Sequence, residues 1–297
     1  MEEKRLINLV YTDLKQRGFD AAISKVYKNN ISTEALTIRL SEDAAVPTIY
    51  PEMLAEMYRP GMSITDLSEE VLRFTEKNIK PAPVINSLLL RENLLSNVTL
   101  GLCKEDWNQD MLQDIVHRHI EGTDLAIYPI LNIDEHGIVK LTPAMLAWDG
   151  LTEEEVMQAA KSNSKKDYTV RPMQEVIAEM TGMPPEALPP LDIVILSNTA
   201  AFYGATSIAD QESLDKACQM LGSRNVIIIP SSLHEVLVVP ADMANSKDIS
   251  NMIREVNDTT VQEHDRLSDH PYIYNGDKLS MLNVRSKEMN RQSGRSR

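Results

Sequence analysis

Four prolines and one glycine lie within residues 181–190. Proline fixes its own φ and donates no backbone hydrogen bond, so neither a long helix nor a central strand can run through this stretch. Its composition is typical of a linker. We therefore expect residues 1–180 to form one module and residues 191–284 a second. A short tail, residues 285–297, follows.

The second module is expected to repeat a strand–strand–helix order twice. Apolar helix positions 249, 253 and 256 each lie 35 residues after positions 214, 218 and 221. This pattern predicts an α+β fold in which four strands form one largely antiparallel sheet, with both helices on one face. The expected segments are strands at Leu191–Leu196 and Tyr203–Ile208, a helix from the cap Asp210 to Gly222, strands at Val226–Ile229 and Glu235–Val239, and a helix capped by Ser246.

The first module is also expected to be α+β. Its helix starts are marked by capping residues, and its turns by glycine and asparagine. The expected elements are a helix ending at Gly18, a hairpin over 22–40, a helix at Pro51–Tyr58, a helix capped by Ser63, strands at Pro83–Leu90 and Leu125–Ile133, a turn at His136-Gly137 into Ile138–Leu141, a helix opened by Thr142-Pro143, and a helix begun by the capping box Thr152–Glu155.

Composition and charge exclude several classes of protein. The 297 residues are 42% hydrophobic and 25% charged, unlike a disordered chain. Two cysteines, Cys103 and Cys218, cannot make a disulfide scaffold or a multi-cysteine zinc site. The net charge of −14 disfavours general affinity for nucleic acid. The basic tail, 285–297, is the exception: we expect it to be disordered, and any nucleic-acid contact to occur there.

Membrane and export signals are not found in the sequence. No apolar run approaches the roughly 18 residues that suggest a membrane helix, and the first residues do not resemble a secretory signal. We therefore expect a cytoplasmic protein with reduced thiols and no membrane partner.

The segment Pro230–Glu235 is the strongest candidate for catalysis. Ser231, Ser232, His234 and Glu235 offer a nucleophile, a base and a carboxylate. Triads, however, are assembled from separate elements, and a nucleophile elbow needs Gly-x-Ser-x-Gly between a strand and a helix. Because these serines lie between two expected strands, the sequence favours a hairpin loop whose hydroxyls bond backbone groups. A hydrolase site stays open as the alternative.

Metal and cofactor motifs are missing from the sequence. His117 and His119 would diverge on the helix that Met111–Val116 predicts. Neither Gly-x-x-x-x-Gly-Lys-Ser/Thr nor Gly-x-Gly-x-x-Gly occurs. We therefore expect no metal and no cofactor. A second group of possible metal ligands lies in a loop-like stretch, and we expect it to be solvated surface. It consists of His264, Asp265, Asp269 and His270.

Several strings in the sequence resemble a known family. Ile229–Val236 (Ile-Pro-Ser-Ser-Leu-His-Glu-Val), Met252–Asn257 and Leu267–Asp269, with further segments upstream, are similar to domain-of-unknown-function family 5688, which consists of uncharacterised bacterial proteins. The resemblance spans about residues 20–275. It implies no reaction and no cofactor. It only raises Ser231, Ser232, His234, Glu235 and the candidate binding residue Asn257 as the first positions to test.

The sequence thus favours a non-enzymatic protein-binding or regulatory module, because it is acidic, carries no cofactor motif and predicts a sheet able to receive a partner. The alternative is a hydrolase-like enzyme that uses Ser231 or Ser232 with His234 and Glu235. A concave pocket with His234 in hydrogen-bond reach of a serine hydroxyl would favour the enzyme. A backbone partner for His234 would count against it.

Overall fold

The computed structural model describes residues 3–40, 44–133, 137–242 and 246–282. The expected turn residue His136 and the tail 285–297 lie outside the described residues. The chain divides into two compact units, Met1–Leu94 and Leu95–Arg297, and each has a hydrophobic core of its own. The expected α+β class is confirmed, with antiparallel strand pairs in both units.

The first unit packs helices against a β-hairpin. The hairpin turns through Asn29 and Asn30, with Asn30 in the left-handed region (φ 63°), as expected for a tight two-residue turn. Ser63 caps its helix by accepting a hydrogen bond from the backbone N–H of Asp66. The elements are α1 (Glu3–Gln16), β1 (Asp20–Lys28), β2 (Ile31–Arg39), β3 (Ala44–Ala45), α2 (Pro51–Met57), α3 (Ile64–Asn78), β4 (Lys80–Pro81), α4 (Ala82–Leu89) and α5 (Arg91–Asn97), which crosses into the second unit.

The strand expected at Pro83–Leu90 is wrong, because this segment forms α4. Its apolar residues at positions 84, 85, 88 and 89 have helical spacing. Pro83 stands in the first turn, where its missing N–H removes no intrahelical hydrogen bond.

The second unit contains two antiparallel sheets. One has the order β5-β7-β6, with β8 also paired to β7; the other has the order β14-β13-β11-β12-β10-β9. The first group of elements is β5 (Thr99–Lys104), α6 (Gln109–Asp114), β6 (Arg118–His119), β7 (Leu125–Asn132), β8 (Ile138–Lys140), α7 (Pro143–Trp148) and α8 (Glu153–Asp167). The second group is β9 (Tyr168–Pro172), α9 (Met173–Thr181), η1 (Pro185–Ala187), β10 (Val194–Asn198), η2 (Gly204–Ala209), α10 (Gln211–Leu221), β11 (Val226–Ile229), β12 (Val236–Pro240), α11 (Ser246–Thr259), η3 (Glu263–Asp265), β13 (Tyr272–Tyr274) and β14 (Leu279–Met281).

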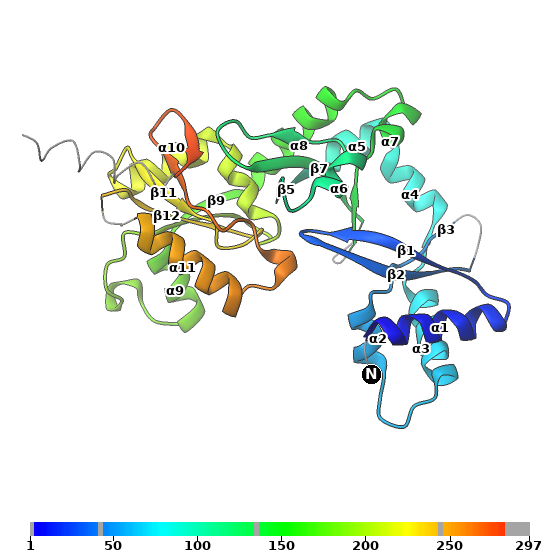
Figure 1. Cartoon of the computed structure of the whole chain (residues 1–297). Helices are drawn as coiled ribbons and strands as arrows, with labels where there is room; N and C mark the ends of the chain where they lie inside the picture. Colours follow the sequence, from blue (N-terminus) through cyan, green and yellow to red (C-terminus); the bar gives the residue numbers. More distant parts are fainter. Residues whose placement is uncertain (1–2, 41–43, 134–136, 243–245, 283–297) are drawn as a thin grey trace, which may run out of the picture. The chain divides into compact units, whose positions relative to one another are not determined.

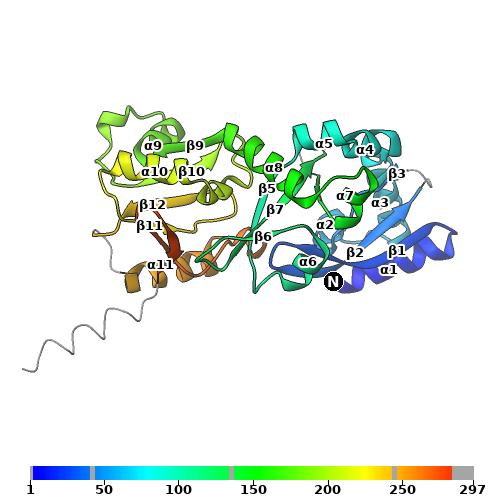
Figure 2. The ribbon, with the colours of Figure 1, turned by 90° about the horizontal axis from the view of Figure 1, so that it is seen from above.

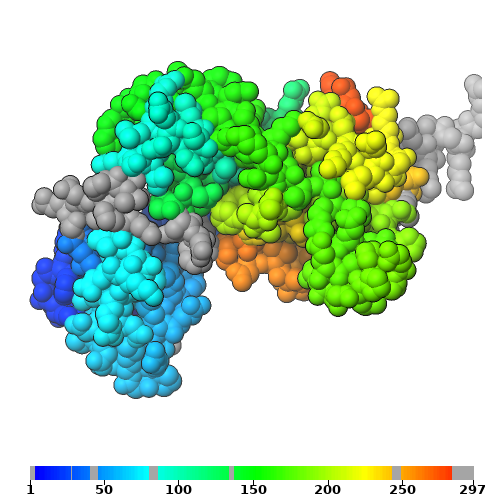
Figure 3. All heavy atoms as spheres, turned by 180° about the vertical axis from the view of Figure 1, so that it is seen from behind, coloured from blue at the N-terminus to red at the C-terminus, as the bar shows by residue number. Residues whose placement is uncertain are grey.

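The proline-rich segment 181–190 lies inside the second unit. It follows α9, and together they connect β9 to β10, which are neighbours in the six-stranded sheet with Val170 opposite Leu196. The space-filling view shows α9 and the residues after it as a lobe (Figure 3). The expected division at 181–190 therefore differs from the division at Leu94, because strand pairing crosses the proline-rich segment.

The expected strand at Tyr203–Ile208 is wrong, because residues 204–209 form the 3-10 helix η2. The hydroxyls of Thr206 and Ser207 donate to the carbonyl oxygens of Tyr203 and Gly204, three residues back. Such local bonds compete with strand pairing. The first of the two expected strand–strand–helix units therefore has only one strand.

Helices α10 and α11 cover opposite faces of the six-stranded sheet, not one face as expected. Ile249 and Ile253 of α11 pack against Ile227 and Ile229. Tyr274, which pairs with Val226 and so faces the other way, donates from its hydroxyl to Asp215 of α10 at 2.7 Å. Figure 1 shows the sheet nearly edge-on, with α10 above it and α11 below, and Figure 2 shows α10 over the strands.

A buried polar network ties the two sheets of this unit together. The Tyr272 hydroxyl donates to Asp124 Oδ1 at 2.6 Å, and Asp124 Oδ2 lies 3.5 Å from Lys104 Nζ. The Lys104 side chain is only 5% exposed and also pairs with Asp106. Because a buried ammonium is costly unless it is paired, these contacts link β5 of one sheet to β13 of the other.

Among the helices of the described residues, none combines the length and the apolar character needed to cross a bilayer.

Candidate functional site

The segment Pro230–Glu235 connects β11 to β12, which are adjacent antiparallel strands. Ser232 accepts a hydrogen bond on Oγ from the backbone N–H of His234 at 3.0 Å. Its own N–H donates to the Glu235 carbonyl oxygen at 3.2 Å. The Ser232 hydroxyl thus stabilises the chain reversal.

Both ring nitrogens of His234 have partners. Nδ1 lies 3.4 Å from the backbone N–H of Tyr203, and Nε2 lies 3.3 Å from Asp265 Oδ1. This arrangement fits the tautomer in which Nδ1 accepts from Tyr203 and Nε2–H donates to Asp265. The second oxygen of Asp265 lies 3.6 Å from His264 Nε2. The carboxylate therefore sits between two imidazoles.

Two further segments hold the backbone of this loop. The His234 carbonyl oxygen accepts from the Ser197 hydroxyl of β10 at 2.7 Å, and the Leu233 N–H donates to the Asp265 carbonyl oxygen at 2.8 Å. Gly204 packs so closely that a Cβ there would overlap the His234 carbonyl oxygen. The loop is thereby fixed by β10, η2 and η3.

Phe202 lies beside this histidine and is 41% exposed. Its ring stacks on the His234 imidazole, with centroids 5.9 Å apart and planes inclined by 26°. Ala201 and Tyr203 on either side adopt left-handed backbone conformations, with φ of 49° and 53°. Asn198 clamps the turn, because its side chain donates to the Phe202 carbonyl oxygen and accepts from the Phe202 N–H. We call Phe202, Tyr203, His234, His264 and Asp265 the His234 corner.

The His234 corner lacks the arrangement of a serine hydrolase in the part of the chain that the structure describes. No hydrogen bond joins the hydroxyl of Ser231 or Ser232 to the His234 ring. Nδ1 is engaged by a backbone N–H, so the ring offers no free acceptor for a serine proton. Glu235 makes no contact with the ring nitrogens, whose carboxylate partner is Asp265.

Asn257 does not belong to this corner. It is a buried residue of α11, 1% exposed, and its side-chain amide donates to the Ser268 carbonyl oxygen at 3.2 Å and to Asp269 Oδ1 at 2.8 Å. Its amide anchors the segment that leads to β13.

The histidines considered for a metal lie elsewhere. The helix expected through Val116 ends at Asp114, and His119 lies in the short strand β6. His117 Nδ1 lies 3.1 Å from the Ile115 carbonyl oxygen, and His119 Nδ1 lies 2.9 Å from Glu105 Oε1. Among the described residues, no group of three or more His, Cys, Asp and Glu side chains is arranged to hold a metal ion.

Sequence reasoning missed Phe202 and Tyr203, because the expected strand Tyr203–Ile208 includes Tyr203 and Phe202 falls in no expected element. A usable signal is present in the sequence: Asn198 precedes Phe202 by four residues and Gly204 follows Tyr203 directly, and both residue types favour turns. Asp265 and His264 were noticed, but only as surface residues.

The chain belongs to a family of unknown function, DUF5688, whose model matches residues 4–276. This is the family that the string around His234 resembled. Comparison with curated proteins found no match. Comparison with solved structures found none either.

Proposed function

We propose that this chain is a cytoplasmic protein-binding module and that the His234 corner is its recognition surface. The observation that carries the proposal is the exposed Phe202 ring, held between two left-handed residues and stacked on His234. A cytoplasmic location is in keeping with two free thiols, Cys103 and Cys218.

The backbone around Phe202 supports a binding role. A left-handed conformation costs a non-glycine residue about 1 kcal/mol or more, and such strain is concentrated at functional positions. The Asn198 hydrogen bonds and the His234 ring hold the turn in place. The Phe202 side chain therefore loses little conformational entropy when a partner buries it. Buried aromatic anchors dominate the binding energy of many interfaces.

The charge around the corner indicates the kind of partner. Asp265 lies in the corner, and Glu263 and Glu235 are close to it in the chain. The whole sequence carries a net charge of −14. Complementary charge accelerates association and selects partners. We therefore propose a basic protein segment that places an apolar side chain against Phe202.

Phe202→Ala is expected to abolish the interaction without unfolding the chain, since the residue lies at the surface and is 41% exposed. Losing an aromatic anchor of this kind weakens binding about 30-fold or more. The measurement is affinity capture from an extract of the native cell with quantitative mass spectrometry, followed by titration of the recovered protein. Met180→Ala, at an 83% exposed residue of α9, is the matched control. A partner that is retained by both variants would contradict the proposal.

The hydrolase alternative is favoured by one observation, the His234–Asp265 pair, which resembles the base and carboxylate of a triad. Because Nδ1 is occupied, we expect a fluorophosphonate probe to label neither Ser231 nor Ser232 in the folded protein. Ser231→Ala, Ser232→Ala and His234→Ala would be compared with the unaltered chain by mass spectrometry. Labelling of one serine that disappears in His234→Ala would support the hydrolase and argue against the binding module.

A further inference from the structure

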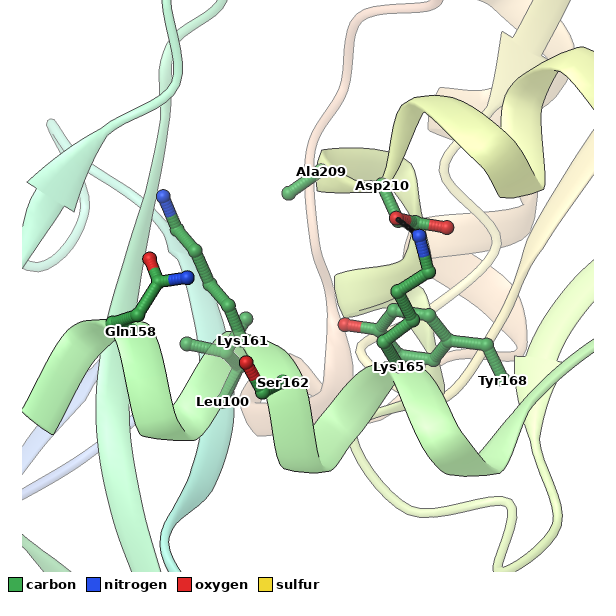
Figure 4. Close-up of a pocket in the computed structure, with 8 residues that line it drawn as sticks. All are labelled: Leu100, Gln158, Lys161, Ser162, Lys165, Tyr168, Ala209 and Asp210. Carbon is green, nitrogen blue, oxygen red and sulfur yellow. Dashed lines mark ion pairs between the residues drawn. The ribbon is translucent and has the colours of Figure 1, made fainter. Parts of the chain in front are cut away.

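A pocket of about 190 Å³ opens beside α8 in the second unit, away from the residues of the His234 corner. Its lining comes from α8, from the start of β9, from β5 and from the junction of η2 with α10 (Figure 4). The lining residues are Leu100, Gln158, Lys161, Ser162, Lys165, Tyr168, Ala209 and Asp210.

One face of α8 supplies most of the polar groups. Residues 158, 161, 162 and 165 follow the i, i+3, i+4, i+7 spacing that places side chains on one side of a helix. The neighbouring stripe of the same helix, with Val156, Met157 and Ala160, is buried. The pocket therefore has a rigid wall of lysine, serine and glutamine side chains beside the hydrophobic core.

Tyr168 lies at the inner end of this wall. Its hydroxyl points into the space between α8 and the Ala209–Asp210 segment (Figure 4). Burial raises the pKa of Tyr168 to about 12, while hydrogen bonds with the side chains of Thr206 and Ser164 act to lower it, so the phenol keeps its proton at neutral pH. Leu100, which is 3% exposed, adds an apolar surface.

The two lysines of the lining differ in their partners among the described residues. Lys165 Nζ lies 3.3 Å from Asp210 Oδ1 and 2.7 Å from Glu212 Oε2. Asp210 is further engaged as the cap of α10, because its Oδ2 accepts from the N–H and the hydroxyl of Ser213. Among the ion pairs of the described residues, none includes Lys161.

We propose that this pocket binds a small anion through a phosphate or carboxylate group. Lys161 supplies the positive charge, and Tyr168, Ser162 and Gln158 supply neutral donors. In a chain with a net charge of −14, an excess of lysine in a pocket selects for a negatively charged ligand. The volume of about 190 Å³ is far above what a single water molecule needs, and it is enough for a small organic acid or a phosphate ester fragment.

The test is titration of the full chain with sodium phosphate and, separately, with sodium acetate, at constant ionic strength set with chloride. Binding is followed by isothermal calorimetry and by NMR of labelled protein. We expect saturable one-to-one binding of at least one probe. Phosphate binding alone would assign a phosphate ligand, and acetate binding alone would assign a carboxylate.

Lys161→Gln is expected to weaken that binding about tenfold or more, because a charge-assisted hydrogen bond is lost. Lys166→Gln is the matched control: it makes the same change of charge on the same helix, where Lys166 pairs with Asn163 outside the pocket lining. Tyr168→Phe keeps the ring and should also weaken binding. Equal effects of the two lysine variants, or no saturable binding of either probe, would overturn the proposal.

Discussion

Gly204→Ala is expected to lower the free energy of unfolding by about 3 kcal/mol or more, since overpacking a rigid site costs this much. A Cβ at position 204 would overlap three atoms: the His234 carbonyl oxygen, the amide nitrogen of Asn198 and Oγ of Ser197. Two of these are backbone atoms, which cannot move aside without shifting β10 or the His234 loop. Urea denaturation followed by circular dichroism measures the loss.

Gly222→Ala is the control that separates the cost of steric overlap at Gly204 from the cost of an unfavourable backbone conformation. Gly222 ends α10 with φ of 60°, and a Cβ there would meet no atom within 4 Å. Its replacement costs only the left-handed conformation, about 1 kcal/mol. If Gly222→Ala proved the more damaging of the two, Gly204 would not be needed for close packing against His234.

Local signals in the sequence predicted much of the fold. Asp210 and Gly222 bound α10 as expected, Thr152 and Glu155 form a reciprocal capping box, and the first hairpin turns at Asn30. Each of these depends on hydrogen bonds or φ angles within a few residues. The residues that set these hydrogen bonds and φ angles lie close together in the sequence, so the sequence alone predicts them.

Features that depend on distant contacts were not predicted. The register that puts Tyr274 and Ile227 on opposite faces of the sheet, and hence α10 and α11 on opposite sides, is set by strands far apart in the sequence. The pairing of β9 with β10 across a proline-rich segment is of the same kind. Strand periodicity alone does not say which helix covers which face.

The candidate site likewise combines a local feature that the sequence predicts with distant contacts that it does not predict. The loop at Ser232 was expected between two strands, and it is there. The partners of His234 come from 31 residues on either side, Tyr203 and Asp265. No local pattern joins them, because the contact exists only after η2 and η3 have packed against the loop.

Raising the pH from 8 to 11 is expected to lower the free energy of unfolding by about 4 kcal/mol through two buried groups, Cys103 and Tyr168. The buried tyrosines Tyr272 and Tyr274, whose pKa values are also raised, add to this loss. Burial, with a smaller effect from Glu105, raises the pKa of the Cys103 thiol from near 9 to about 12. Burial also raises the pKa of Tyr168 from near 10 to about 12. Urea denaturation at pH 8 and at pH 11 measures the difference.

The sign follows from which state holds the protons. Well below pH 9 both groups are protonated in the folded and in the unfolded chain, so their stabilising effect is fully present. Above that pH the unfolded chain loses the Cys103 proton and then the Tyr168 proton, while the folded chain keeps both until about pH 12. The unfolded state therefore binds fewer protons, and stability falls as the pH rises.

Two variants assign the loss to its sources. Between pH 8 and pH 11, Cys103→Ala should lose about 2.7 kcal/mol less than the unaltered chain and Tyr168→Phe about 1.4 kcal/mol less, because each variant lacks the share of one group. Comparing each variant with itself at the two pH values removes the cost of the substitution at pH 8. Were Cys103→Ala to lose as much stability as the unaltered chain, the buried thiol would not contribute to the alkaline sensitivity.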